Sequence, residues 1–386
     1  MSNKTQQQNK VHVKKGEQPS DTVSCIKWLN STLFFVSTWA SEIIGYQVEE
    51  MEVNRVYYKK LQHLAILNIE IKQTQNSVLI WYANEIGELF QISTNEDDPI
   101  SYLMAEYPII FIQNIQMGLL SVDMAGYIRI NKTIINDQIT KPSNTNQAQK
   151  IKLTKYCGLQ LNYDNQNQSL IGCSVDFPFI LLYGMSQNIY LIDLQQNVFD
   201  LIEHPFKQVY VSCGQVKKNS LLNGEIILGT FDGLICRIKF EKFGDDFFLW
   251  DKDDTKNNLL HFTKREIQIL KNYNQQSQSV SSQRQNLPNS LNVYTFSVNS
   301  IQVLPQNSKG KRNFISCGGD GKVILSKKPY SQFIENYILQ SVSCISLNSQ
   351  ATLLVIAVGY DWHQGNKPQN YCPFIEIIKL NNNFNN

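Results

Sequence analysis

The chain of 386 residues is long enough for two or three average domains or for one large all-β unit, and a hydrophobic content of 42% can fill a core. The chain has 35 Lys and Arg against 33 Asp and Glu, so its net charge is too small to attract nucleic acid or membranes over the whole surface. Binding of either kind requires a local basic patch. The eight cysteines are never spaced as CxxC, and none flanks a histidine at zinc-finger distance. We therefore expect no metal site, and free thiols typical of a reducing compartment.

Residues 1–20 are polar throughout, and we expect a flexible N-terminal segment without a secretory leader. The longest apolar stretches, such as 107–122, are interrupted by Gln and Asn. They fall short of a membrane-spanning helix, so we expect a soluble protein without membrane insertion.

One unit recurs along the chain: an apolar strand, a tight turn, and a second strand of alternating polarity. It occurs at residues 33–50, 77–93, 118–133, 178–194, 225–240, 313–328 and 352–380. Asp232–Gly233 and Asp320–Gly321 predict two-residue hairpin turns, because Gly adopts positive φ and Asp tolerates it.

The spacing of these turns is close to the pitch of roughly 40–45 residues that WD-type repeats show, with four strands per blade. The sequence therefore predicts an all-β fold, a single seven-bladed WD-repeat β-propeller over residues 21–386. A polar stretch at 272–290 is interpreted as a loop insertion. We expect the strand near Lys10–Lys15 to close the ring by pairing with the last blade.

Motifs of catalysis are missing from the sequence. Residues 316–323 resemble a phosphate-binding loop, but Ser316 stands where the first glycine is needed and Val323 follows the lysine. There is no G-x-S-x-G or H-E-x-x-H motif, and the five histidines are scattered. We expect neither enzymatic activity nor a cofactor.

Three basic clusters are candidates for phosphate contact, at residues 263–266, 309–312 and 326–328. Taken singly, each is more typical of a solvated loop. All three fall in or beside one predicted blade, which favours a shared patch.

The loop after the apolar run 351–358 carries Tyr360, Asp361, Trp362 and Pro368. With this loop, the chain resembles the nuclear mRNA export factors of the WD-repeat class, the Rae-type or Gle-type nucleoporins, and more distantly the Bub-type checkpoint propellers. Three other blades also resemble the family. The matching residues are Trp39 in the first blade; Glu203, Pro205, Lys207 and Asp232–Gly233 in the fifth; and Val298, Asn299, Pro305 and Asp320–Gly321 in the sixth.

This resemblance implies a monomeric ring within a larger assembly, at the nuclear pore and in the nucleus, and also in the cytoplasm. It implies binding of a short helical GLEBS-like motif of an FG-repeat nucleoporin, and contact with single-stranded RNA, directly or through the complex. The residues that it assigns to partner binding are Lys207, Lys264, Arg265, Lys327 and Lys328. Leu234, Ser326 and Lys327 depart from the family's pattern.

Structural roles in turns and blades are expected for Trp39, Asp232, Gly233, Asp320, Gly321, Asp361 and Trp362. Two alternative functions remain open at this point. One is a mitotic checkpoint or kinetochore scaffold that binds a peptide motif of a kinase. The other is a ciliary or cytoskeletal WD-repeat structural protein.

Overall fold

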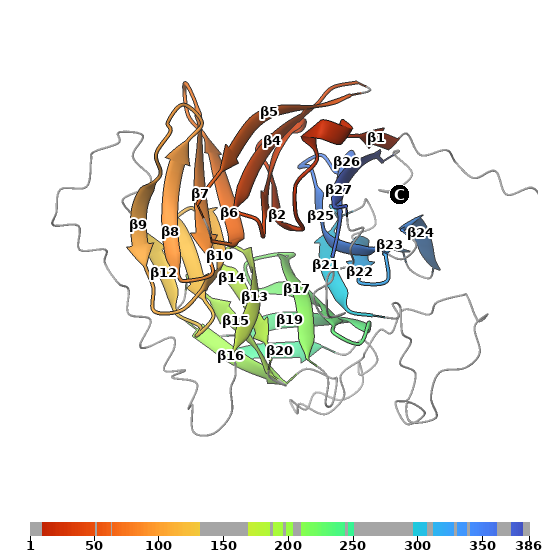
Figure 1. The fold of residues 1–386 in the computed structure, drawn as a ribbon. Coiled ribbons are helices and arrows are strands. Elements are labelled where there is room, and N and C mark those ends of the chain that lie inside the picture. The colour runs from red at the N-terminus through yellow and green to blue at the C-terminus, as the bar shows by residue number, and fades with distance from the viewer. Residues whose placement is uncertain are drawn as a thin grey trace, which may run out of the picture.

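The computed structural model describes residues 10–50, 52–62, 64–131, 169–185, 188–195, 198–203, 210–243, 246–250, 296–306, 312–327, 330–337, 340–360 and 372–380. Within these residues the strands form seven antiparallel sheets, six of four strands and one of three. The sheets follow one another round a ring in chain order, and the blue last blade returns to the red strand β1 (Figure 1). The fold is a seven-bladed β-propeller, as the repeat predicted.

The blades are numbered from the inner to the outer strand of each sheet. Blade 1 comprises β2 (Val23–Trp28), β3 (Leu33–Thr38), β4 (Glu42–Val48) and β5 (Val53–Lys60). Blade 2 comprises β6 (Ile66–Gln73), β7 (Val78–Asn84), β8 (Glu88–Ser93) and β9 (Ile100–Met104). Blade 3 comprises β10 (Ile109–Ile115), β11 (Gly118–Asp123) and β12 (Ile128–Asn131). Blade 4 comprises β13 (Leu170–Asp176), β14 (Phe179–Gly184), β15 (Asn188–Asp193) and β16 (Val198–Glu203).

Blade 5 comprises β17 (Val211–Lys218), β18 (Asn223–Thr230), β19 (Ile235–Phe243) and β20 (Asp246–Trp250). Blade 6 comprises β21 (Val298–Val303), β22 (Phe314–Gly318), β23 (Lys322–Lys327) and β24 (Tyr330–Asn336). Blade 7 comprises β25 (Ser341–Leu347), β26 (Leu353–Gly359), β27 (Phe374–Lys379) and β1 (Lys10–His12). Each predicted strand–turn–strand unit is the second and third strand of one blade.

Ring closure uses the N-terminal strand, as predicted. Val11 of β1 lies opposite Ile377 of β27 in an antiparallel pair, and a short 3-10 helix, Lys15–Glu17, follows. Residues 10–12 belong to the segment 1–20 that we expected to be flexible, so the ring begins before the expected boundary at residue 21. Closure protects the outer edge of β27 from pairing with other chains.

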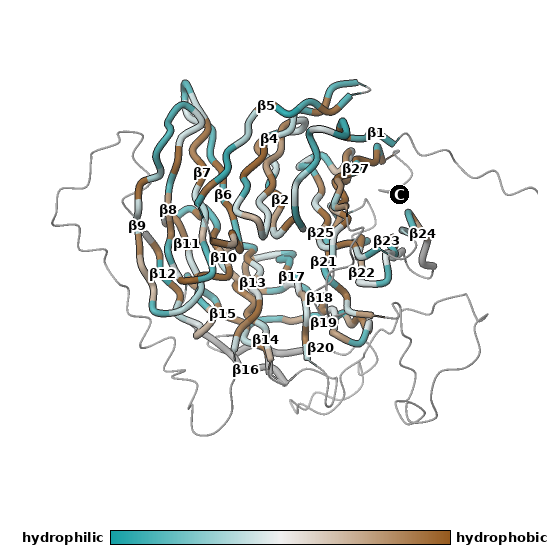
Figure 2. Tube along the Cα trace, in the orientation of Figure 1, coloured by the Kyte–Doolittle hydropathy of each residue, from teal (hydrophilic) through white to brown (hydrophobic). Residues whose placement is uncertain are grey.

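The core consists of seven apolar clusters among the described residues, one between each pair of neighbouring blades. The second strands are buried on both sides, and β26 is buried along its whole length. Outer strands such as β5 alternate and face solvent, a contrast that Figure 2 shows as brown central strands and a teal outer strand. Each fully buried Ile, Leu or Phe contributes about 1.5–3 kcal/mol.

The turn between the second and third strands has one geometry in five blades. The turn spans four residues, and the fourth has positive φ and donates its N–H to the carbonyl of the first. The fourth residues are Ser41, Gly87, Gly126, Gly233 and Gly321. The prediction of two-residue turns was wrong. In blade 5 the Thr230 N–H donates to the Leu234 carbonyl, so three residues, 231–233, form the loop, and Gly233 is the last of them.

Every inner strand carries a β-bulge near its start, seen as a register shift in all seven described sheets. Three of these bulges have the sequence Val-Ser-Cys, beginning at Val23, Val211 and Val342. Side chains at the bulges also reach the next blade: Ser212 Oγ donates to the Val298 carbonyl at 2.6 Å, and Asn299 Nδ2 to the Val342 carbonyl at 2.9 Å. The bulges therefore help to join the blades.

The ring has two faces with different connections, because adjacent strands run in opposite directions. The face named here the turn face carries the turns between second and third strands and the connections from each outer strand to the next blade. In blade 1, for example, the Leu61 N–H after the outer strand bonds the Ser41 carbonyl in the turn at 2.9 Å. The opposite face carries the remaining connections.

Candidate functional site

Exposed apolar side chains gather on the turn face. Of the fourteen large hydrophobic side chains that are exposed in the described part of the chain, seven lie in its turns and connections, against two in the connections of the opposite face. The seven are Trp39, Ile86, Tyr107, Tyr127, Met185, Tyr210 and Phe296. Exposed aromatic side chains of this kind are typical anchors for partner proteins.

The segments that carry these side chains are fixed by a repeated hydrogen bond. The first residue after the second strand donates its N–H to the carbonyl that precedes the inner strand of the same blade. This bond joins Trp39 to Thr22, Glu85 to Ala65, Met124 to Pro108, Met185 to Ser169, Phe231 to Tyr210 and Gly319 to Ser297. The turn face is thus a preorganised surface, which lowers the entropic cost of binding.

Polar side chains of the turns accept backbone hydrogen bonds as well. Asp123 Oδ1 accepts the N–H groups of Ala125 (3.1 Å) and Tyr127 (2.9 Å), and Asp123 Oδ2 pairs with Arg129 at 2.8 Å. Burial raises the pKa of Asp123 above its ordinary value, although those N–H groups and the guanidinium oppose the rise. Asn84 and Thr38 begin the turns of blades 2 and 1 and also accept backbone N–H groups.

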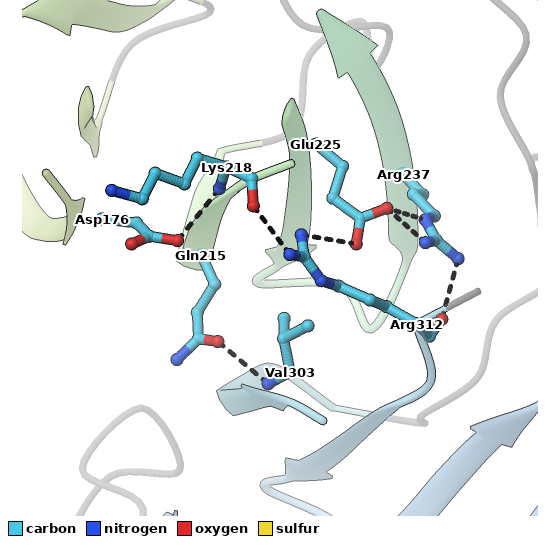
Figure 3. A network of polar contacts seen from close by, with 7 residues as sticks. All are labelled: Asp176, Gln215, Lys218, Glu225, Arg237, Val303 and Arg312. Atoms are coloured by element: carbon cyan, nitrogen blue, oxygen red, sulfur yellow. Dashed lines mark hydrogen bonds and ion pairs between the residues drawn. The ribbon is translucent and has the colours of Figure 1, made fainter. Parts of the chain in front are cut away.

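The opposite face carries a buried ionic network between blades 5 and 6 (Figure 3). The Glu225 carboxylate is buried, accepts a hydrogen bond from Arg237 Nε at 2.7 Å, and lies 3.7 Å from Arg312 Nη1. Arg237 also donates to the Arg312 carbonyl at 3.1 Å. The Glu225 carboxylate therefore interacts with guanidinium groups from two blades.

The same network continues to blade 4. Arg312 Nη2 donates to the Lys218 carbonyl at 2.7 Å, and the Lys218 N–H donates to Asp176 Oδ2 at 2.9 Å. In addition, the Val303 N–H donates to Gln215 Oε1 at 3.0 Å (Figure 3). These bonds hold three neighbouring blades in register.

A second buried ion pair joins blades 4 and 5 on this side. Lys242 Nζ lies 2.6 Å from Asp193 Oδ2, and both side chains are almost fully buried. Such a pair is favourable only while both partners are present, because a single buried charge is costly. It acts as a structural clamp between the blades.

Basic residues concentrate on the opposite face of blades 5 and 6. Arg312 belongs to the cluster 309–312 and precedes β22, and Lys327 belongs to the cluster 326–328 and ends β23, so both clusters meet this face. Lys217 and Lys218 end the inner strand of blade 5 beside them. The cluster 263–266 follows β20 in the sequence and lies outside the described residues.

Of the five predicted partner-binding residues, Lys327 alone lies within the described part of the chain. It ends β23 and lies opposite Tyr330 of β24. Lys207, Lys264, Arg265 and Lys328 lie outside the described residues.

The residues expected to have structural roles lie mainly in the turns. Trp39 is in the turn of blade 1 with 41% of its surface exposed. Asp232 accepts from Thr230 Oγ1 at 2.6 Å, and Asp320 pairs with Lys322 at 2.7 Å, each beside the glycine of its turn. Asp361 and Trp362 lie outside the described residues.

Sequence reasoning missed the exposed tyrosines and phenylalanine of the turn face. Tyr107, Tyr127 and Tyr210 stand immediately beside a turn or an inner strand. Their signal was available: each is an aromatic residue at a position where a turn needs only small or polar residues.

Thiol and metal chemistry have little support in the described part of the chain. Its seven cysteines are free, and it holds no group of three or more His, Cys, Asp or Glu that could bind a metal ion. Burial raises the pKa of the Cys213 thiol to about 12. Nor does any helix among these residues have the length and hydropathy to cross a membrane.

Comparison with solved structures shows the same fold. A structure of U3-55K superposes with a TM-score of 0.57 at 9% identity, covering 96% of this chain and 98% of that one. The WD40 β-propeller domain of Doa1 superposes with a TM-score of 0.55 at 11% identity, covering 97% and 98%. No protein-family model and no curated protein matches the sequence. The chain thus has the fold of a WD40 propeller.

Proposed function

We propose that the protein is a non-enzymatic adaptor that docks short segments of partner proteins on the turn face of its ring. The observation that carries this proposal is the set of exposed apolar side chains on that face, held on hydrogen-bonded turns. A rigid ring with preorganised anchors binds partners without any catalytic group.

The partner that we propose is an FG-repeat nucleoporin with a helical GLEBS-like motif, which gives the adaptor a role in mRNA export at the nuclear pore. The support is the sequence resemblance, strongest over residues 200–240 and 295–375. The same resemblance assigns Lys207, Lys264 and Arg265 to partner binding, and their positive charge would suit an acidic helical segment.

RNA contact is proposed for the opposite face of blades 5 and 6. Lys327 ends β23 of blade 6, and Lys217 and Lys218 end β17 of the neighbouring blade 5. Phosphate contacts come mainly from Lys and Arg, so this face is suited to a nucleic-acid backbone. Nucleoporin and RNA would then occupy opposite faces, as an adaptor between cargo and pore requires.

The test is affinity capture of native partners from cell extract with the full chain, followed by mass spectrometry. We expect recovery of an FG-repeat nucleoporin, its loss with Lys207→Glu combined with Lys264→Glu, and its retention with Lys217→Glu on the opposite face. Recovery of a checkpoint kinase, or of tubulin with axonemal proteins, and no nucleoporin would replace the export role with one of the alternatives.

A further inference from the structure

The turn face of blades 1 to 3 forms one continuous surface, named here the acidic arc. Its segments are residues 39–41, 60–62 with 64–65, 84–88, 105–108 and 123–129. Backbone hydrogen bonds link each segment to the next: Leu61 to Ser41, Glu85 to Ala65, Ala105 to Gly87 and Met124 to Pro108, all between 2.8 and 3.2 Å. The side chains of these segments are therefore neighbours on a rigid support.

Four apolar side chains stand out from the arc. Trp39, Ile86, Tyr107 and Tyr127 are between 41% and 46% exposed. Trp39 lies in the turn of blade 1 and Ile86 in that of blade 2, while Tyr107 precedes blade 3 and Tyr127 lies in its turn. A set that extends over three blades suits an elongated ligand better than a small molecule.

The charge of the arc is negative. Its described segments contain four acidic side chains, Glu85, Glu88, Glu106 and Asp123, and two basic ones, Lys60 and Arg129, which gives 2 − 4 = −2. Both cations are engaged within the arc: Lys60 donates to the Ala40 carbonyl, and Arg129 pairs with Asp123. Glu85 and Glu106 are exposed.

One contact within the arc shows how a cation is held there. The guanidinium of Arg129 lies 5.3 Å from the centre of the Tyr127 ring while its nitrogen pairs with Asp123. The arc also exposes the aromatic side chains of Trp39 and Tyr107 and the carboxylates of Glu85 and Glu106. Such a combination favours Lys and Arg side chains over anions.

From these features we infer that the acidic arc binds a basic segment of a partner protein, one that combines Lys or Arg with at least one aromatic or aliphatic side chain. An RNA backbone is disfavoured because the carboxylates repel phosphates. The arc belongs to the turn face that carries the proposed adaptor function, so this inference rests on that function. The export role rests on other residues, among them Lys207 and Lys264, so its test and the test of the arc can fail separately.

The test uses the immobilised full chain and a phage library of random 16-residue peptides. We expect enrichment of peptides that contain Lys or Arg together with aromatic or aliphatic residues. A selected peptide is then synthesised and labelled, and its affinity is measured by fluorescence anisotropy. Because exposed charges are screened by salt, its dissociation constant should rise steeply between low and high salt.

Two variants address the charge and the apolar anchors separately. Glu85→Lys with Glu106→Lys should weaken the selected peptide by about tenfold or more. Ile86→Ser with Tyr107→Ser keeps the charge and should weaken it similarly. The matched controls lie on the opposite face. Glu96→Lys with Asp98→Lys makes the same change in charge, and Leu221→Ser with Leu222→Ser removes exposed apolar side chains. Each control should change the affinity for the peptide by less than about twofold.

Several results would overturn the inference. These are enrichment of acidic peptides, enrichment of none above the uncoated support, or an equal loss with the opposite-face controls. Concentration-dependent dimerisation by sedimentation velocity, abolished by the arc variants, would show that the arc binds a second copy instead.

Discussion

The two faces of the ring are built from the same strands and differ in what their connections carry. The turn face presents apolar side chains and, in blades 1 to 3, carboxylates on backbone-fixed turns. The opposite face of blades 4 to 6 buries ion pairs between blades and carries two half-buried lysines, Lys217 and Lys218. Because the core lies between the blades, each set of connections can change its chemistry without disturbing the fold.

This difference separates stability from binding. Ionic groups of the opposite face bridge neighbouring blades, so their loss should weaken the ring. Exposed groups of the turn face make few such contacts, so their loss should leave the ring intact. The predictions below test this division, beginning with the largest expected effect.

Removing one partner of the buried pair between blades 4 and 5 should be the most damaging change. In Asp193→Ala the Lys242 ammonium stays buried without its carboxylate, and we expect a loss of about 3–5 kcal/mol in the free energy of unfolding. Urea denaturation measures it. The double variant Asp193→Leu with Lys242→Met should recover most of the loss; a single variant as stable as the parent would contradict the role of the pair.

Removing the shared carboxylate of blades 5 and 6 should cost less, because the two arginines are partly exposed. For Glu225→Ala we expect a loss of about 2–3 kcal/mol. Hydrogen exchange should show faster opening in blades 5 and 6 than in blade 1. Uniform opening of all blades, or no change in stability, would show that the network does not join these two blades.

A backbone change on the turn face should have an intermediate effect. Gly87 has a φ of 89°, and a Cβ there would lie 2.5 Å from the Tyr107 carbonyl oxygen, so Gly87→Ala should cost about 1–3 kcal/mol. Gly16→Ala is the matched control, because nothing lies within 4 Å of its Cβ position. Equal melting temperatures for the two variants would show that the turn is not fixed.

The smallest expected effect concerns pH and Asp123 on the turn face. Burial raises its pKa above the ordinary 3.8, so the folded protein binds its proton more tightly than the unfolded chain does. The stability from this group is therefore present below pH 3.8 and is lost as the pH rises through the raised pKa.

We therefore expect the wild type to lose free energy of unfolding relative to Asp123→Asn as the pH rises from 3.8 towards neutrality, by less than about 1 kcal/mol. Urea denaturation of both proteins over this range measures the difference. A gain for the wild type over the same range would show that the Arg129 pair outweighs burial.

The sequence by itself determined the seven strand–turn–strand units, the glycines with positive φ, and the closing strand near Lys10. These features depend on local patterns: alternation along a strand, the absence of Cβ in a turn, and continuous apolar runs where a strand is covered on both sides. The length of the turns was mispredicted, because Asp-Gly fits several turn types and cross-strand register decides between them.

Only the tertiary structure decided which side chains meet. Whether Arg312 meets the Lys218 carbonyl depends on the number and direction of the strands between them, and whether Tyr107 is exposed depends on the neighbouring blade. The pairing of Lys242 with Asp193, from separate blades, has no local signal either. Such contacts arise from long-range packing between blades, which no short stretch of sequence encodes.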